Sequence, residues 1–361
     1  MMALKKEWER NGMKTGEAGG AGFPLDLDAV AAYLAERGLT LDRDAGATRL
    51  SGGLSNLNDR IVVDGRAVVL RRPPMGDLPP GAHDMAREHR VLSVLWRAFP
   101  PAPLSLLLCT DRGHIGVPFQ LLEHRTGLVV RGVDLPPELA TPESRRALSL
   151  ELVRTLAAFH AVEPESVGLD DFGRPEGFFS RNVAGWRKRG AIVGAADTTS
   201  ARIEAICDWL DNATPRDLPP TLLHSDIKLD NCMLNELRIT TILDWDMATR
   251  GDPSMDLGTL LSYWEEPGDP PCMQALAQMP TTAPGFLSRT EVVEAYARAT
   301  GRELGQFHSW RILAMLKLGV VFLQLHRNWV RGVSGDARFA TFGALGDDLV
   351  EWTLDLTTQP L

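Results

Sequence analysis

The chain has 361 residues, of which 44% are hydrophobic and 24% are charged, a balance that is typical of a soluble globular protein with more than one core-building unit. Its net charge of −9 argues against a nucleic-acid backbone as the main ligand. The four cysteines lie far apart and show no C-x-x-C spacing, which argues against a disulfide framework or structural zinc and indicates a reducing, cytoplasmic compartment.

The N-terminal residues 1–24 are rich in charged residues and glycine and contain no apolar segment. We therefore interpret them as a disordered tail and not as a signal peptide. The most apolar segment of the chain is residues 312–325, but Lys317 and Gln324 interrupt it and it is shorter than the ~20 residues that cross a bilayer. We expect this segment to be a buried helix of a protein with no membrane partner.

Residues 25–123 predict a small lobe that contains an antiparallel sheet. Asp26 is placed to cap the first helix, and the dipeptide Asp64-Gly65 is typical of a two-residue hairpin turn. The residues at 84–99, before the next two expected strands, have apolar side chains spaced along one side of a helix. The expected elements are a helix at 27–37, strands at 60–63 and 66–71, a helix at 84–99, and strands at 104–110 and 116–123.

After a hinge near Glu123, residues 124–361 predict a larger and mostly helical lobe. Thr141-Pro142-Glu143 is a strong helix start, because it combines a capping hydroxyl, proline and an acid in the first turn. The proline-rich loop at 265–284 is long enough to be a lid or a specificity element. The expected elements are helices at 142–160, 257–264, 289–300 and 307–329, and short strands at 221–224, 231–234 and 238–244.

The most informative segment is residues 224–231, with the sequence HSDIKLDN, between two short strands. An Asp two residues after a His and five before an Asn is the spacing of a phosphotransferase catalytic loop. Asp226 would reach the proton of an acceptor hydroxyl, and Asn231 would hold a metal ion on the nucleotide phosphates.

Two further features occur in the order that this chemistry requires. Asp244 ends an apolar strand thirteen residues after Asn231, where phosphotransferases place the carboxylate that binds Mg²⁺. Upstream, Gly52 and Gly53 join two strands, and glycine there lets backbone N–H groups approach a phosphate. An ordinary hairpin turn is the alternative for the two glycines.

With these residues in place, the sequence resembles the aminoglycoside phosphotransferase-like family of the protein-kinase-like superfamily. Several stretches are similar to the branch found with acyl-CoA dehydrogenases, and the resemblance covers roughly residues 26–335. They are GGLSN at 52–56, VLRRPP at 69–74, REH at 87–89, LDDFGRP at 169–175 and LDWDMATRGDPSMDLG at 243–258. The resemblance implies an α+β, bilobal protein-kinase-like fold, with a nucleotide-binding lobe at 25–123 and catalytic, metal and acceptor sites at 124–361.

The resemblance also assigns roles to single residues. It implies that Asp226 is the catalytic base, that Asn231 and Asp244 bind Mg²⁺, and that Asp256 braces the catalytic loop by hydrogen bonds. The residues that it implies for binding ATP are Gly52, Gly53, Ser55, Asn56, Arg71, Glu88 and Glu123, the last at the adenine hinge.

Two residues depart from the family pattern. Ser225 stands where the family has glycine, and serine has less backbone freedom. Arg71 stands where the nucleotide-binding lysine is expected, since the chain has no lysine between Lys14 and Lys188. Arginine keeps the charge and can contact phosphate or Glu88, so we interpret Arg71 as functional.

The leading hypothesis is an enzyme that transfers phosphate from Mg·ATP to a hydroxyl of a small molecule, such as a hydroxyacyl-CoA or a hydroxy acid. An aminoglycoside acceptor is the first alternative. A non-catalytic nucleotide-binding module is a second, which the missing lysine and Ser225 favour and the intact set of Asp226, Asn231 and Asp244 opposes. The sequence leaves the oligomeric state open.

Overall fold

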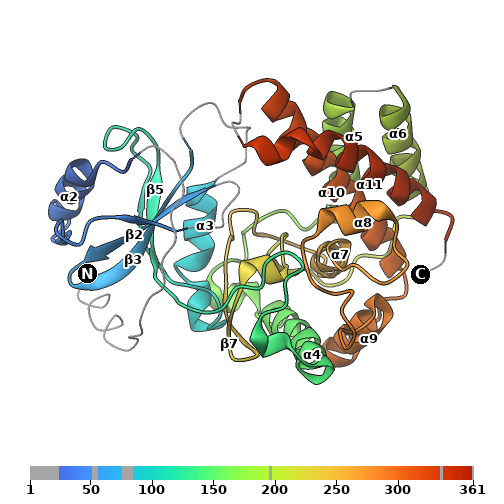
Figure 1. Ribbon diagram of the computed structural model, residues 1–361, viewed down its shortest axis with the longest axis horizontal. Helices are drawn as coiled ribbons and strands as arrows, with labels where there is room; N and C mark the ends of the chain where they lie inside the picture. The colour runs from blue at the N-terminus through green and yellow to red at the C-terminus, as the bar shows by residue number, and fades with distance from the viewer. Residues whose placement is uncertain (1–23, 51–55, 75–83, 195–196, 334–335, 360–361) are drawn as a thin grey trace. The chain divides into compact units, whose positions relative to one another are not determined.

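The computed structural model describes residues 24–50, 56–74, 84–194, 197–333 and 336–359 (Figure 1). The chain forms two compact units. The first extends to Trp96 and includes Ala102–Leu128, and the second comprises Arg97–Pro101 and Val129–Leu361. Residues 1–23 of the tail predicted at 1–24 lie outside the described residues, as do the predicted site residues Gly52, Gly53 and Ser55.

The first unit contains a five-stranded antiparallel sheet with the strand order β1-β2-β3-β5-β4. Helix α2 contributes Val30 and Leu34 to a core beneath this sheet, and the side chain of Asp26 caps the helix at the amide of Ala29. The elements are α2 Leu27–Ala35, β1 Thr48–Arg49, β2 Leu57–Val63, β3 Arg66–Arg72, α3 Met85–Leu92, β4 Ser105–Cys109 and β5 Phe119–Glu123.

The predicted hairpin between β2 and β3 is confirmed. Asp64 and Gly65 have φ values of 49° and 73°, as a two-residue turn with a left-handed backbone requires, and Val63 pairs with Arg66 across it. The pairing continues to Leu57 and Arg72. Because the register is set by the turn, it places the site residue Arg71 opposite Asn58.

The helix predicted at residues 84–99 is shorter than expected. Helix α3 ends at Leu92, and a separate 3₁₀ turn covers Leu95–Arg97. The hydroxyl of Ser93 donates to the carbonyl of Arg90, which competes with the helical backbone, and Pro100 disfavours a helical conformation at the residue before it.

The second unit is mainly helical and has two short antiparallel ladders, β6 with β9 and β7 with β8. Helix α10 packs against α5, α6, α7 and α11, which gather around it in Figure 1. The helices are α4 Pro142–His160, α5 Phe178–Val193, α6 Asp197–Asn212, α7 Ser254–Ser262, α8 Pro271–Leu276, α9 Arg289–Thr300, α10 Phe307–Val330 and α11 Phe342–Leu356. The strands are β6 Thr221–Leu223, β7 Cys232–Asn235, β8 Arg238–Ile242 and β9 Thr249–Gly251.

Helices α7 and α10 approach closely, which matters for the site described below. A Cβ on Gly258 would lie 2.9 Å from the carbonyl oxygen of Trp310, so only glycine fits at this contact. Helix α10 is buried along most of its length, as its apolar sequence predicts. Among the residues that the structure describes, no helix has the length and hydropathy needed to cross a membrane.

The loop at residues 265–284 is more ordered than the sequence suggests. It contains α8, and Arg289 holds its first part through ion pairs with Glu266 at 3.1 Å and with Asp269. The hydroxyl of Thr281 donates to the carbonyl of Glu265 across the loop. These contacts anchor both ends of the segment that the sequence analysis interpreted as a lid or a specificity element.

Candidate active site

Three polar side chains contact the carboxylate of Asp226, two from the segment between β6 and β7 and one from the end of α7. The hydroxyl of Tyr263 donates to Oδ1 at 2.9 Å. The amide of Asn231 donates to Oδ2 at 3.0 Å and to the backbone carbonyl of Asp226 at 2.8 Å, and the ammonium of Lys228 lies 3.2 Å from Oδ2. Both oxygens of the predicted catalytic carboxylate are therefore oriented by neighbouring side chains.

The charge on Asp226 is stabilised by these neighbours. Burial by itself would raise the pKa of this carboxyl, but the cations Lys228 and Lys317 outweigh burial, and the hydrogen bond from Tyr263 adds to their effect. The pKa of Asp226 is lowered overall, so the group is ionised at neutral pH. An ionised carboxylate accepts hydrogen bonds only, which suits it to bind and orient a hydroxyl donor.

The buried carboxylate of Asp256, on α7, braces the start of the loop. Its two oxygens accept hydrogen bonds from the backbone amides of His224 and Ser225, each at 2.7 Å. The imidazole of His160 lies 3.3 Å from the same carboxylate. The resemblance implied this bracing role, and the observed hydrogen bonds agree with it.

His224 supports the loop through both ring nitrogens. Its Nδ1 accepts from the amide of Asp226 at 3.2 Å, which leaves the proton on Nε2, and Nε2 lies 2.8 Å from the carbonyl of Leu243. The ring is fully buried and packs edge-on against Trp245. His224 is therefore positioned as a structural partner of Asp226.

Ser225 has φ at 69°, in the left-handed region where a side chain is strained by about 1–2 kcal/mol. This conformation explains why glycine would suit the position. We expect Ser225→Gly to increase the free energy of unfolding by about 0.5–1 kcal/mol, because relief of strain exceeds the extra freedom of glycine in the unfolded chain. Ser225→Val should decrease the free energy of unfolding by more than about 1 kcal/mol, because a β-branched side chain is more strained in the left-handed region than serine is.

Urea unfolding of the two variants beside the wild type measures both changes. Equal stability of Ser225→Gly and Ser225→Val would contradict the left-handed conformation.

Backbone pairing places the positions of the predicted metal ligands, Asn231 and Asp244, next to each other at the base of the β7–β8 hairpin. Cys232 pairs with Ile242, and the amide of Leu243 donates to the carbonyl of Asn231 at 2.8 Å. Asp244 follows directly, with φ at 67°. The amide nitrogen of Asn231 is used by Asp226, so its Oδ1 is the atom suited to a cation. An amide oxygen and a carboxylate are hard oxygen ligands that fit Mg²⁺.

In the first unit, Arg71 on β3 and Glu88 on α3 form a buried ion pair with an Nε–Oε2 distance of 2.7 Å. The side chains of Arg71 and Glu88 are 7% and 1% exposed. Gln120, on β5, also donates to Glu88, and Asn58 lies 3.4 Å from a terminal nitrogen of Arg71. The pairing that the sequence suggested is thus present, with Gln120 as a partner that the sequence did not reveal.

Two other residues predicted to bind ATP are described in this unit. Asn56 is buried directly before β2. Glu123 ends β5, where its amide donates to the carbonyl of Leu104 at 2.8 Å and its carboxylate pairs with Arg125 at 2.8 Å. These contacts fix the conformation of the segment that the resemblance assigned to adenine.

The sequence analysis did not identify three residues near Asp226 as site residues, namely Lys228, Tyr263 and Lys317. Lys228 lies within the motif itself, so its spacing from Asp226 could have revealed it. Tyr263 lies within the helix predicted at 257–264, where an aromatic residue is usually part of the core, and Lys317 was noted only as an interruption of an apolar segment. Tyr263 comes from the end of α7 and Lys317 from α10, and no local pattern links them to the loop.

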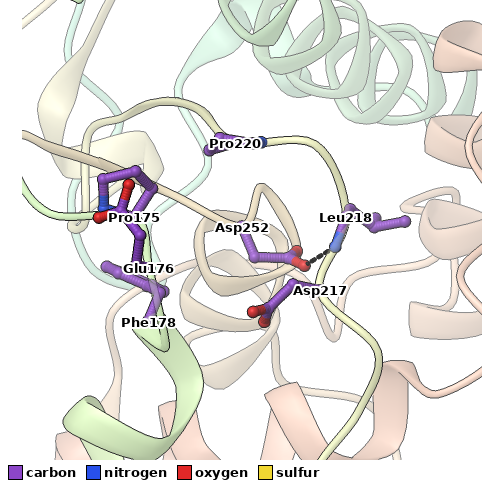
Figure 2. Close-up of a pocket in the computed structure, with 7 residues that line it drawn as sticks. All are labelled: Pro175, Glu176, Phe178, Asp217, Leu218, Pro220 and Asp252. Carbon is purple, nitrogen blue, oxygen red and sulfur yellow. Dashed lines mark hydrogen bonds between the residues drawn. The ribbon is translucent and has the colours of Figure 1, made fainter.

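The second unit also has a cavity of about 210 Å³ that is distinct from these residues (Figure 2). Its acidic lining includes Asp217 and Asp252, and burial together with the charge of Asp252 raises the pKa of Asp217. Asp252 accepts a hydrogen bond from the amide of Leu218, shown as the dashed line. Neither Asp226 nor Asn231 lines this cavity.

Comparison with known proteins identifies the family. The profile of the phosphotransferase enzyme family matches residues 46–292, which is more than half of the chain and includes the loop, Asp226 and Asp244. The chain belongs to the phosphotransferase enzyme family. This match confirms the prediction of a phosphotransferase that was made from the catalytic loop.

Solved structures of this family share the fold. A candidate aminoglycoside phosphotransferase from Ralstonia eutropha has a TM-score of 0.74 and 24% identity, with coverage of 92% of this chain and 98% of that chain. A thermostable mutant of the aminoglycoside phosphotransferase APH(4)-Ia, in a complex with AMP-PNP and hygromycin B, has a TM-score of 0.59 and 18% identity over 92% and 100% of the two chains. The predicted α+β, protein-kinase-like fold is confirmed.

The similar curated proteins confirm the branch that the sequence resembled. Acyl-CoA dehydrogenase family member 10 of Mus musculus is 28% identical over 94% of this chain, and member 11 of Rattus norvegicus is 29% identical over 93%. The matched parts are 33% and 44% of the two relatives. The chain therefore spans less than half the length of these relatives.

Proposed function

We propose that this member of the phosphotransferase enzyme family transfers the γ-phosphate of Mg·ATP to a hydroxyl group of a small molecule. The observation that carries the proposal is the grouping of Asp226, Asn231 and Asp244 around one loop and one hairpin base. A base for the acceptor and oxygen ligands for a metal are the parts that phosphoryl transfer requires. The buried, free cysteines support a cytoplasmic location.

In this mechanism, Asp226 binds the acceptor hydroxyl and receives its proton as the new bond from the acceptor oxygen to the γ-phosphorus forms, while the bond from the γ-phosphorus to the β–γ bridging oxygen breaks and ADP leaves. Its lowered pKa makes it a weak base, which is sufficient because the transition state of phosphoryl transfer is loose and the acceptor oxygen needs little activation before the O–P bond forms. Lys228 lies close enough to neutralise the reacting oxygens. Mg²⁺, when held by Asn231 and Asp244, supplies further neutralisation of the phosphates.

The first unit is proposed to hold the nucleotide. Arg71 would contact phosphate oxygens while its Nε stays on Glu88, since a guanidinium has donors on more than one edge. Asn56 and Glu123 would contribute as the resemblance implies, Glu123 through the backbone at the adenine.

We propose a hydroxyacyl-CoA or another anionic hydroxy acid as the acceptor. Burial lowers the pKa of Lys317, the carboxylates of Asp226 and Asp256 oppose this, and the charges of Lys228 and Arg189 lower it further, so the three cations lie near one another close to Asp226. Arg189 also stacks on Trp186 at 4.4 Å, which holds its guanidinium on α5. Lys317 and Lys228 are largely buried, and Arg189 is the exposed member of this cluster, where it would attract an anionic group and repel a polycation such as an aminoglycoside.

A thermal-shift titration tests the nucleotide and metal sites. At about 100 times its Kd, Mg·ATP should stabilise the wild type by ~2.7 kcal/mol. Asp244→Ala should lose the Mg²⁺-dependent part of this shift, while Asp134→Ala, a change of an exposed acid in the same unit, should retain it. No shift in the wild type with ATP or GTP would contradict the proposed function, and a shift without transfer to any hydroxyl would favour a non-catalytic module.

Turnover with competing acceptors tests the substrate class. We expect a hydroxyacyl-CoA to be phosphorylated with at least a tenfold higher kcat/KM than kanamycin, roughly the effect of one well-placed ion pair. Arg189→Gln should raise the KM for the anionic acceptor by about fivefold, whereas Lys188→Gln, on the adjacent position of α5, should leave it unchanged. Preference for kanamycin would contradict the anionic acceptor.

A further inference from the structure

Lys317 has a setting that a purely structural residue of α10 would not need. It lies in the middle of the apolar helix, is 7% exposed, and is flanked by the buried residues Leu316 and Leu318. Burying an ammonium group costs on the order of several kcal/mol of desolvation free energy. An apolar side chain of similar volume often stabilises a buried position as well or better. The charge is therefore retained for a reason other than packing.

The ammonium of Lys317 donates to one atom of the catalytic loop, the carbonyl oxygen of Ser225. That carbonyl belongs to the peptide that joins Ser225 to Asp226. The N–H of the same peptide donates to Nδ1 of His224 at 3.2 Å. The peptide immediately before the catalytic residue is thus held at both of its polar atoms.

The orientation of this peptide controls where Asp226 points. Ser225 is in the left-handed region, with φ at 69°, and Asp256 already holds the N–H of Ser225 at 2.7 Å. Rotation of the next peptide would move the Cα–Cβ direction of Asp226 and break its contacts with Tyr263 and Asn231. Lys317 is the group that opposes this rotation from the carbonyl side.

We propose that Lys317 is a positioning residue for Asp226, acting through the carbonyl of Ser225. The inference rests on the proposed function, because its consequence for catalysis requires Asp226 to be the base. It predicts a specific pattern in which the geometry of the loop and the rate of transfer depend on an N–H donor at position 317, while nucleotide binding does not.

The test uses Lys317→Met, an apolar replacement of similar length, with Gln324→Met on the same helix as the control. We expect Lys317→Met to lower kcat by about 10- to 100-fold, the loss that one charged hydrogen bond predicts, and to leave the KM for ATP within twofold. Hydrogen exchange at the amides of Ser225 and Asp226 should accelerate by about tenfold or more. Gln324→Met should leave kcat, the KM for ATP and the exchange rates of these amides unchanged.

A second variant keeps the test valid if Lys317→Met fails to fold. Lys317→Ala leaves space for a small amine, so ethylammonium should restore part of the kcat and slow the exchange again. Tetramethylammonium has the same charge but no N–H donor and should restore neither.

The outcomes separate this inference from the proposed function. Unchanged exchange and unchanged kcat in Lys317→Met overturn the positioning role, as does equal rescue by tetramethylammonium. If the wild type transfers no phosphate but exchange in the loop still depends on position 317, the positioning role stands and the proposed function fails.

Discussion

Asp226→Asn should lower kcat by about 10²- to 10⁴-fold and leave the affinity for Mg·ATP within twofold of the wild type. The amide keeps the size of the carboxylate and can still bond to Asn231 and Tyr263, but it does not accept a proton from the acceptor. Steady-state turnover with a hydroxyacyl-CoA and a thermal-shift titration with Mg·ATP measure the two quantities on the same protein.

The control for this prediction is Asp134→Asn, which makes the same chemical change at an exposed position of the second unit. Its kcat should stay within twofold of the wild type. Turnover by Asp226→Asn at the wild-type rate would show that another group accepts the proton, and the assignment of the catalytic base would be wrong.

Glu88→Gln should decrease the free energy of unfolding by about 3–5 kcal/mol, because it removes the charge of the buried carboxylate that pairs with Arg71. Gln120 would also lose a charged acceptor and face a neutral amide. Urea unfolding, followed by a probe in the first unit, measures the change. The same variant should weaken Mg·ATP binding, since Arg71 would no longer be held on α3.

An exposed ion pair provides the matched control. Glu294 and Arg298 on α9 lie 3.4 Å apart, with side chains that are 58% and 69% exposed. Glu294→Gln should change the free energy of unfolding by less than about 0.5 kcal/mol, because solvent screens the pair. A cost for Glu88→Gln no larger than that of Glu294→Gln would mean that the Arg71–Glu88 pair contributes little to the fold.

Local sequence signals located most of the elements that the structure contains. Asp64-Gly65 specified a turn because both residues tolerate a left-handed backbone, and Thr141 specified a helix start because its hydroxyl caps the amide of Ser144. The helix at 84–99 was predicted too long, because its end depends on a side-chain hydrogen bond from Ser93 and on Pro100. Strand β9 was missed, since its three residues form a strand only through pairing with β6.

The amino-acid sequence by itself determined the family and the order of the chemical groups Asp226, Asn231 and Asp244, because the spacing within one loop and one hairpin is a local property. Only the tertiary structure decided which distant groups surround them. Tyr263 and Lys317 reach the loop because α7 and α10 pack closely at Gly258, a contact between segments more than 50 residues apart in sequence. No periodicity in either helix encodes that contact, since it depends on the packing of the whole helical unit.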